Sequence, residues 1–441
     1  MSSTPVNYPP AAPLAGGIKQ RSASVPNETS WHYQNQQLCM EAVPVDRMAE
    51  KVSTPFYCYS AAAIRGRIGL CQSAFEAIGA TIHYAVKANS NLAVLGLMAE
   101  AGLGADIVSE GELVRALQAG IEPRTIIFSG VGKRRAELLA ALDAGIFQFN
   151  LESLPELEQL ADLCRTRGCT ANVSIRVNPE VDAATHRHIT TGVKGSKFGI
   201  PIEQMASALN LIAASDGLQL HGLAVHIGSQ IVEPEPYRRA CRRLRRWVFD
   251  MRAQGHAINH LDLGGGFGID YGDGRCLDYR AVAAVMEQEL GDLAVQIAVE
   301  PGRSLVAEAG LLVSEVVYRK EVEPVPFLIL DAGMNDLLRP ALYQATHQLV
   351  TLKEPDGVPE ICHVVGPVCE SSDTFLRQVS LPQIAAGERV ALLHAGAYGA
   401  VMASGYNSRD IIPEVMVSGD HYTLVRRAVS YRDLMAYELP E

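Results

Sequence analysis

From about residue 60 to residue 305 the sequence alternates short β-rich runs with amphipathic helical segments, and this alternation constrains the fold most. Strands that alternate with helices are typical of βα units, which build parallel sheets. Eight such runs occur: TIHYAVK, GADIVS, TIIFSG, FQFN, NVSIRVN, LHGLAVHIG, HLDLGG and VQIAVEPG. Eight parallel strands with helices between them, in about 245 residues, predict a (β/α)8 TIM-like barrel.

The rest of the chain predicts further domains. Its 441 residues exceed the roughly 250 to 300 at which a single core stops growing. After Gly310 the sequence changes to β-branched runs broken by turns, such as EICHVVGPVC and RVALLHAGAY. We therefore predict an α/β chain with the barrel at 59–308 and a mostly-β domain at 309–441. Residues 1–32, rich in Pro, Ser and Ala, are expected to form a flexible tail, with a transit peptide as the alternative.

Charge and cysteine content exclude several classes of partner. A net charge of −11 argues against nucleic acid or an anionic membrane. The arginine cluster YRRACRRLRRW is interpreted as a solvated helix, and no window reaches the apolar length of a membrane span. Nine cysteines, an odd number without a CxxC pair, predict free thiols, a reducing cytoplasmic compartment and no metal site.

Polar side chains gather where the predicted strands end, and carboxyl strand ends meet at one rim of such a barrel. Lys87 closes the first strand, and a buried lysine is normally paired or chemically used. The alternative is that Lys87 only extends to solvent. Along the other strands the same rim is expected to receive Asp106, Ser109, Arg176, His226, Ser229, residues 264–268 and residues 300–303.

This rim has the groups that a phosphorylated aldehyde would need. The three glycines at 264–266 predict close backbone approach to a phosphate, although a tight turn is the alternative. Ser229 and Arg303 add phosphate donors. An amine at Lys87 facing such a site indicates pyridoxal phosphate, because lysine forms a Schiff base with its aldehyde. Glu300 is expected to hold the pyridine nitrogen and His226 to stack on the ring, unless His226 is an ordinary core residue.

Ten motifs carry a resemblance to a known family over roughly residues 32 to 435. They are YAVKAN, GADIVSEGE, SIRVNP, TGVKGSKFGI, HIGSQ, LDLGGGFG, VEPGRS, DAGMNDLLRPALY, GPVCESSD and GAYG. In this order they resemble the fold-type III pyridoxal phosphate decarboxylases, which share the alanine racemase-like barrel, and among them those that act on diaminopimelate. The departures are a long tail and Ser53 where a glycine is common.

The resemblance implies an architecture and a set of roles. A segment at 33–58 would join the β domain, and two chains would form a homodimer with shared active sites. Lys87 would carry the cofactor and Cys369 would donate a proton, although a buried hydrophobic role is the alternative for Cys369. The implied cofactor site comprises Lys87, Asp106, Arg176, His226, Ser229, Gly265, Gly266, Glu300, Pro301, Gly302, Arg303 and Tyr398. The implied substrate site comprises Arg303, Arg339, Tyr343, Glu370 and Tyr398.

Charge in the far part of the pocket selects the substrate. Diaminopimelate keeps an ammonium and a carboxylate at its free end, which requires a cation and an anion side by side. Arg339 with Tyr343 offers the first and Glu370 the second, whereas a surface ion pair is the alternative for Arg339. An ornithine or lysine decarboxylase would need only the acid, because a buried unpaired arginine is costly.

The sequence therefore predicts decarboxylation of meso-2,6-diaminopimelate to L-lysine and CO2, the last step of lysine biosynthesis, through a Schiff base on Lys87. An alanine racemase would, by family comparison, place an arginine where this chain has Glu300. A decarboxylase of another basic or D-amino acid stays open as an alternative. So does a non-catalytic pyridoxal-binding homologue, although Lys87, Glu300, Cys369 and Glu370 are all present.

Overall fold

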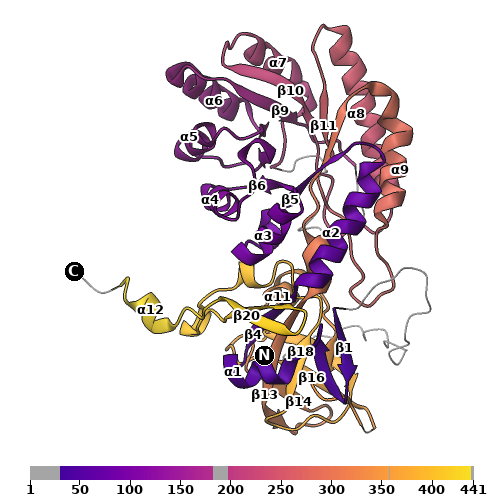
Figure 1. Ribbon diagram of the computed structural model, residues 1–441, viewed down its shortest axis with the longest axis vertical. Helices are drawn as coiled ribbons and strands as arrows, with labels where there is room; N and C mark the ends of the chain where they lie inside the picture. The colour runs from indigo at the N-terminus through magenta and orange to yellow at the C-terminus, as the bar shows by residue number, and fades with distance from the viewer. Residues whose placement is uncertain (1–29, 182–196, 357, 439–441) are drawn as a thin grey trace, which may run out of the picture.

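The computed structural model describes residues 30–181, 197–356 and 358–438. Two lobes follow one another along its long axis, one built of strands and helices and one mostly of strands (Figure 1). Most of the predicted tail, and residues 191–196 of the TGVKGSKFGI motif, lie outside the described residues. In the described part, no helix is long and apolar enough to cross a membrane.

The first lobe is a closed barrel of eight parallel strands, which confirms the predicted fold. The strands neighbour one another in the order β10-β11-β12-β5-β6-β7-β8-β9. Pairing of Ala298 with Thr81 joins the last strand to the first. The strands are β5 (Thr81–Ala85), β6 (Gly104–Ile107), β7 (Ile126–Phe128), β8 (Gln148–Leu151), β9 (Ala171–Arg176), β10 (Leu218–Ala224), β11 (His260–Asp262) and β12 (Gln296–Val299).

Helices surround the barrel and have the end signals expected from the sequence. Ser109 and Ser153 cap the first turns of α4 and α6 through their side chains. Gly145 and Gly168 end α5 and α6 in left-handed conformations. The helices are α2 (Ala61–Glu76), α3 (Leu92–Glu100), α4 (Glu110–Gln118), α5 (Arg135–Ala144), α6 (Leu154–Arg167), α7 (Met205–Ala213), α8 (Glu235–Ala253), α9 (Tyr279–Leu290) and α10 (Arg303–Val306).

The second lobe is a β domain whose central strands come from both ends of the chain. β4 lies between β13 and β19, so a strand that precedes the barrel pairs with strands that follow it. The strands are β4 (Phe56–Ser60), β13 (Gly310–Lys320), β14 (Phe327–Leu330), β15 (Leu349–Thr351), β16 (Glu360–Val365), β17 (Thr374–Leu381), β18 (Arg389–Leu392), β19 (Glu414–Ser418) and β20 (His421–Arg426). The short helix α11 (Arg339–Tyr343) lies within this region, and α12 (Tyr431–Met435) projects from it (Figure 1).

The segment before β4 packs on the β domain. It forms β1 (Trp31–Gln34), β2 (Gln37–Met40), β3 (Val43–Pro44) and α1 (Val45–Val52). Leu38, Met40 and Met48 share a buried apolar cluster with Leu311 and Val313 of β13. Burial of such side chains stabilises the packing by about 1.5 to 3 kcal/mol each.

The sequence prediction that Lys87 closes the first strand is wrong by two residues. β5 ends at Ala85, and Lys87 lies in a 3-10 turn, η1 (Val86–Ala88). The chain turns here because it contacts the β domain: the Ala88 carbonyl accepts from Tyr398 N–H at 2.8 Å, and the Asn89 side chain donates to the Gly396 carbonyl at 3.0 Å. These bonds fix Lys87 at the junction of the two lobes.

Candidate active site

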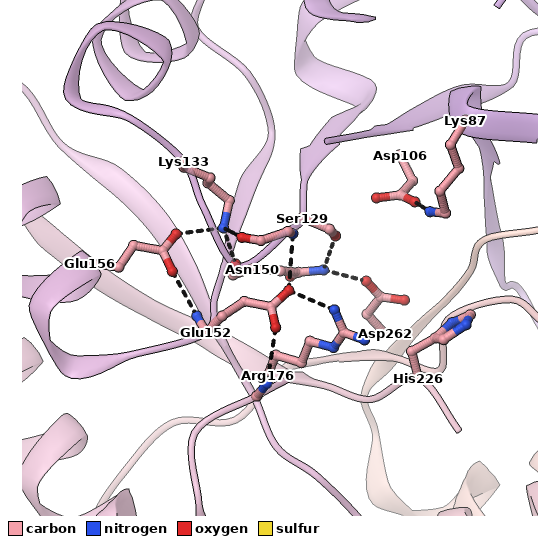
Figure 2. A network of polar contacts seen from close by, with 12 residues as sticks. Lys87, Asp106, Ser129, Lys133, Asn150, Glu152, Glu156, Arg176, His226 and Asp262 are labelled. Carbon is pink, nitrogen blue, oxygen red and sulfur yellow. Dashed lines mark hydrogen bonds and ion pairs between the residues drawn. The ribbon is translucent and has the colours of Figure 1, made fainter. Parts of the chain in front are cut away.

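Lys87 lies at the carboxyl rim of the barrel and forms an ion pair with Asp106, at the end of β6 (Figure 2). Asp106 is fully buried, and its Oδ1 has no hydrogen-bond partner among the described residues. Burial lowers the pKa of the Lys87 ammonium, but the charges of Asp106 and Glu300 outweigh this effect and raise that pKa above its ordinary value. The amine is therefore held as a cation beside Asp106.

The glycine loop after β11 packs too closely for any other residue. A Cβ at Gly265 would lie 2.0 Å from the Glu300 carbonyl oxygen. A Cβ at Gly266, whose φ is +97°, would lie 2.2 Å from the Gly228 carbonyl oxygen. Only glycine fits at either position, so the backbone of this loop can approach a bound anion closely.

His226 follows β10 and is oriented by the same loop. Its Nδ1 accepts from the Gly265 N–H at 3.2 Å, so that nitrogen carries no proton. Burial keeps the pKa of His226 well below its ordinary value, and the charges of Arg176 and Lys87 add to the effect. The ring at the pocket wall is therefore a neutral imidazole.

Two buried carboxyl groups, Glu300 and Asp262, lie close enough that each affects the pKa of the other. Asp262 accepts from the Gly264 N–H at 2.9 Å and from the Asn150 side chain at 2.8 Å, and both bonds stabilise its charged form. Burial raises the pKa of Glu300 well above its ordinary value, and the charges of Asp106 and Asp262 raise it further. The Oε1 of Glu300 has no hydrogen-bond partner in the described part of the chain.

Arg303 begins α10, directly after the EPG turn that ends β12. Its guanidinium donates to the Tyr271 hydroxyl at 2.9 Å and to the Ser229 hydroxyl at 3.0 Å. It also lies 4.8 Å from the centre of the Tyr398 ring. The side chain is buried, and its Nε has no hydrogen-bond partner within the described residues.

Arg339 approaches the same pocket from α11 of the β domain. Its guanidinium lies 4.6 Å from the centre of the Tyr271 ring and donates to His347 Nε2 at 2.8 Å. Tyr343, one turn later, lines the same pocket. Burial lowers the pKa of Arg339. In the part of the chain that the structure describes, neither Arg303 nor Arg339 forms an ion pair with a carboxylate.

One pocket brings most of the predicted site residues together. Phe267, which belongs to the predicted rim segment 264–268, and Ala85, which was not predicted, also line it. Asp106 reaches Lys87 from β6, and the Pro301 carbonyl accepts from the Ala85 N–H at 3.0 Å. The predicted residues that line the pocket are Lys87, His226, Ser229, Gly266, Glu300, Gly302, Arg303, Arg339, Tyr343 and Tyr398.

Of the residues predicted for catalysis or substrate binding, Cys369 and Glu370 do not line this pocket within one chain. Cys369 is exposed, and its N–H donates to the Asn407 side chain at 3.2 Å. Glu370 is also exposed and accepts from the Tyr406 hydroxyl at 2.6 Å. Both lie in a loop of the β domain.

Arg176 also lies outside the lining and belongs to a buried polar network at the carboxyl ends of β7, β8 and β9 (Figure 2). It pairs with Glu152 at 2.6 Å, and Glu152 also accepts from the Gly199 N–H at 2.9 Å. Beside this pair, the ammonium of Lys133 contacts Glu156 and the Asn150 carbonyl oxygen. Asn150 links this network to Asp262.

Sequence reasoning missed four residues that position the site: Asp262, Asn150, Tyr271 and His347. Asp262 had a usable signal, because it is an acidic residue inside the apolar run HLDLGG. Asn150 likewise is a polar residue at the end of the predicted strand FQFN. Tyr271 and His347 had none, since they lie in loops of different domains and meet only in the folded chain.

Comparison with known proteins agrees with this geometry. Residues 61–307 match the family model described as pyridoxal-dependent decarboxylase, pyridoxal binding domain. The diaminopimelate decarboxylase of Zymomonas mobilis is 42% identical over 409 residues, 92% of this chain and 97% of that protein. The one from Pseudomonas aeruginosa is 43% identical over 413 residues, 93% of this chain and 98% of that protein.

The chain belongs to the diaminopimelate decarboxylases. A solved structure of this family, from Helicobacter pylori and complexed with L-lysine, is 39% identical and superposes with a TM-score of 0.86. The match covers 89% of this chain and 99% of the chain in that structure. Membership of the family confirms the predicted pyridoxal phosphate cofactor and makes the chain a decarboxylase rather than a racemase.

The residues of this chain fit that cofactor. The glycine loop leaves room for an anion where a Cβ would not fit. Glu300 Oε1 and Arg303 Nε are buried polar atoms without partners among the described residues, as expected for groups that bind a ligand. A primary amine, a carboxyl group and a guanidinium thus surround one pocket.

Proposed function

We propose that the protein releases CO2 from the D-configured carbon of meso-2,6-diaminopimelate and yields L-lysine, with pyridoxal phosphate held covalently by Lys87. The observation that carries this proposal is the pair of buried guanidiniums, Arg303 and Arg339, in the pocket of Lys87. A buried charge without a counter-ion is costly, so both sites favour anionic ligands. The cofactor phosphate and the substrate carboxylates are such anions.

The barrel residues are proposed to bind the cofactor. Ser229, Gly266 and Arg303 offer donors to the phosphate, and the neutral ring of His226 offers a flat surface to the pyridine ring. Glu300 is the carboxyl group proposed to face the ring nitrogen. When bound, the cofactor supplies the electron sink that allows the carboxylate to leave as CO2.

The pair Glu300 and Asp262 is proposed to control the proton at the ring nitrogen. Asp262 is fixed by Asn150 and by the Gly264 N–H, so its charge lies at a constant position beside Glu300. Burial raises the pKa of Glu300, and the charge of Asp262 raises it further. The pair can therefore donate a hydrogen bond to the ring or accept one from it.

Arg339 and Tyr343 are proposed to bind the carboxylate at the far end of the substrate, and Arg303 is proposed to contact both this carboxylate and the cofactor phosphate. After CO2 has left, this end is the amino-acid end of L-lysine. Substrates without that carboxylate, such as ornithine or lysine, would leave Arg339 buried beside Arg303 without an anion. This cost favours diaminopimelate over decarboxylation of other basic amino acids.

Cys369 and Glu370 are proposed to complete the site of a second copy of this chain. Both are exposed on a loop of the β domain, and neither lines the pocket of its own chain. In a homodimer, Cys369 would return a proton to the substrate carbon and Glu370 would pair with the free ammonium. This arrangement uses both residues without any change of fold.

The division of the chain is kept as a proposal, with the barrel at 59–308 and the β domain formed by 33–58 and 309–441. The pairing of β4 with β13 and β19 supports placing the early segment in the β domain. A cytoplasmic location is also proposed. It is supported by nine free cysteines, most of them buried.

Replacement of Arg339 tests the substrate assignment. In Arg339→Met, turnover of diaminopimelate should fall steeply because the far carboxylate loses its partner. Slow background decarboxylation of L-lysine should fall less, or rise, because lysine has no such carboxylate. CO2 release from both substrates measures this difference, and an equal fall for both would contradict the proposal.

A further inference from the structure

Tyr271 lies between the two guanidiniums of the pocket. Its hydroxyl accepts from Arg303 at 2.9 Å, and the face of its ring lies 4.6 Å from the guanidinium carbon of Arg339. Arg303 comes from the barrel and Arg339 from the β domain. Because Tyr271 contacts both, it helps to fix the distance between the two guanidiniums. Like charges in a buried site repel, and a ring face together with a hydroxyl lone pair offsets part of that repulsion.

His347 fixes Arg339 from the other side. A guanidinium only donates hydrogen bonds, so the bond of 2.8 Å from Arg339 requires a lone pair on His347 Nε2. A carbonyl only accepts, so the bond of 2.8 Å to the Leu393 oxygen requires a proton on Nδ1. The two contacts together define one neutral tautomer. Burial lowers the pKa of His347 to about 3, and the charge of Arg339 adds to the effect.

The loop that carries Tyr271 is itself fixed. Asp270 accepts from the N–H groups of Gly272 at 2.7 Å and Gly274 at 2.9 Å, which closes the turn around Tyr271. The Tyr271 ring also meets the His347 ring edge-on, with the ring centres 5.5 Å apart. Tyr271, His347 and the two arginines therefore form one connected group.

We propose that Tyr271 and His347 are positioning residues that hold Arg303 and Arg339 ready for the carboxylate at the far end of the substrate. This inference rests on the proposed function and extends it to two residues that touch the arginines. The cost of ordering both guanidiniums is met in the folded protein, so substrate binding does not have to supply it. Tyr271 and His347 thereby strengthen the preference of the pocket for ligands with that carboxylate.

Two ligands that differ by one carboxylate isolate this effect. L-lysine and 1,5-diaminopentane have the same chain and the same two amines. Titration of the cofactor-loaded enzyme by calorimetry gives Kd for each ligand. The ratio of the two Kd values reports the far carboxylate alone, and it does not depend on turnover.

Four variants separate positioning from folding. His347→Leu and Tyr271→Leu should each reduce the ratio by about tenfold or more, the effect of a hydrogen bond to a charged group. His347→Gln should keep most of the ratio, because its amide can accept from Arg339 and donate to Leu393. Tyr271→Phe should have an intermediate ratio, because it keeps the ring beneath Arg339 and loses the hydroxyl beside Arg303. In the two leucine variants KM for diaminopimelate should rise more than kcat falls.

His363→Leu is a matched control in the same domain. His363 stacks on Phe327 and accepts from the Gln378 N–H at 3.3 Å, outside the pocket. This variant should lower Tm without changing the ratio of Kd values. If His347→Leu does not fold, His347→Asn replaces it, because the shorter amide cannot reach both partners.

The outcomes are distinct. Equal weakening of both ligands in the leucine variants, or failure of His347→Gln to restore the ratio, would overturn the positioning role. A wild-type enzyme that binds both ligands equally would instead contradict the proposed function, because no carboxylate site would then exist.

Discussion

Complementation between two inactive variants tests whether each active site is shared by two chains. Lys87→Ala removes the amine in the barrel, and Cys369→Ala removes the thiol in the β domain. Each variant alone should be inactive. Because Cys369 is exposed and does not line the pocket of its own chain, a mixed dimer should contain one site with both residues intact.

The size of the recovery follows from the arrangement. Random exchange between equal amounts of two chains gives mixed dimers as about half of the population, as expected for twofold symmetric dimers. One of the two sites in each mixed dimer takes Lys87 from one chain and Cys369 from the other. Activity should therefore return to about a quarter of the wild-type value.

The assay measures lysine formed from diaminopimelate after the two variants, carrying different affinity tags, have been mixed and exchanged. Purification through both tags in succession verifies that mixed dimers exist, and these should have about half of the wild-type activity. The matched control mixes Lys87→Ala with a double variant that carries both substitutions, which cannot restore a site. Verified mixed dimers without activity would refute the shared site and the placement of Cys369 opposite Lys87 of another chain.

Three further predictions concern the cofactor and stability. Lys87→Ala should lose the visible absorption of the bound cofactor, because Lys87 is the one amine among the described residues that line the pocket; an unchanged spectrum would exclude Lys87 as the attachment site. Burial lowers the pKa of His260 to about 3 from its ordinary 6.5, so its contribution to stability is complete above pH 6.5 and is lost as the pH falls toward 3. In His260→Phe, the unfolding free energy should therefore fall less steeply with decreasing pH over that range, by about 1.4 kcal/mol per pH unit. Urea unfolding at several pH values measures this slope, and a slope equal to that of the wild type would contradict the prediction. Lys133→Met should cost about 3 to 5 kcal/mol in urea unfolding because it leaves Glu156 buried without its cation, and Glu156→Gln added to it should recover part of that loss; no recovery would argue against the ion pair as the cause.

The sequence predicted the barrel because each β-rich run is bounded by helix caps and turns, signals that act locally. It also predicted that Lys87, His226 and Glu300 share a rim, because parallel strands place their carboxyl ends together. The strand end at Ala85 was missed, since the turn depends on bonds to the β domain, which are remote in sequence.

The contacts that orient the site were less accessible to sequence reasoning. The bond from Arg339 to His347 requires the backbone directly after β18 to fix the imidazole, and Tyr271 of the barrel contacts Arg339 of the β domain. Such contacts arise from tertiary packing and leave no periodic pattern. The carboxyl pair of Glu300 and Asp262 was predictable in part, because each is an acid within or after an apolar run.

The central claim is that two buried guanidiniums select a substrate with a carboxylate at each end. The most direct test supplies the cofactor-loaded enzyme with meso-diaminopimelate, L-lysine and L-ornithine, and measures CO2 together with the amine product. We predict one L-lysine for each CO2 from diaminopimelate, and kcat/KM at least about 10⁴-fold lower for the other two, because they leave buried charged groups unpaired. Comparable CO2 release from L-lysine or L-ornithine would contradict the claim.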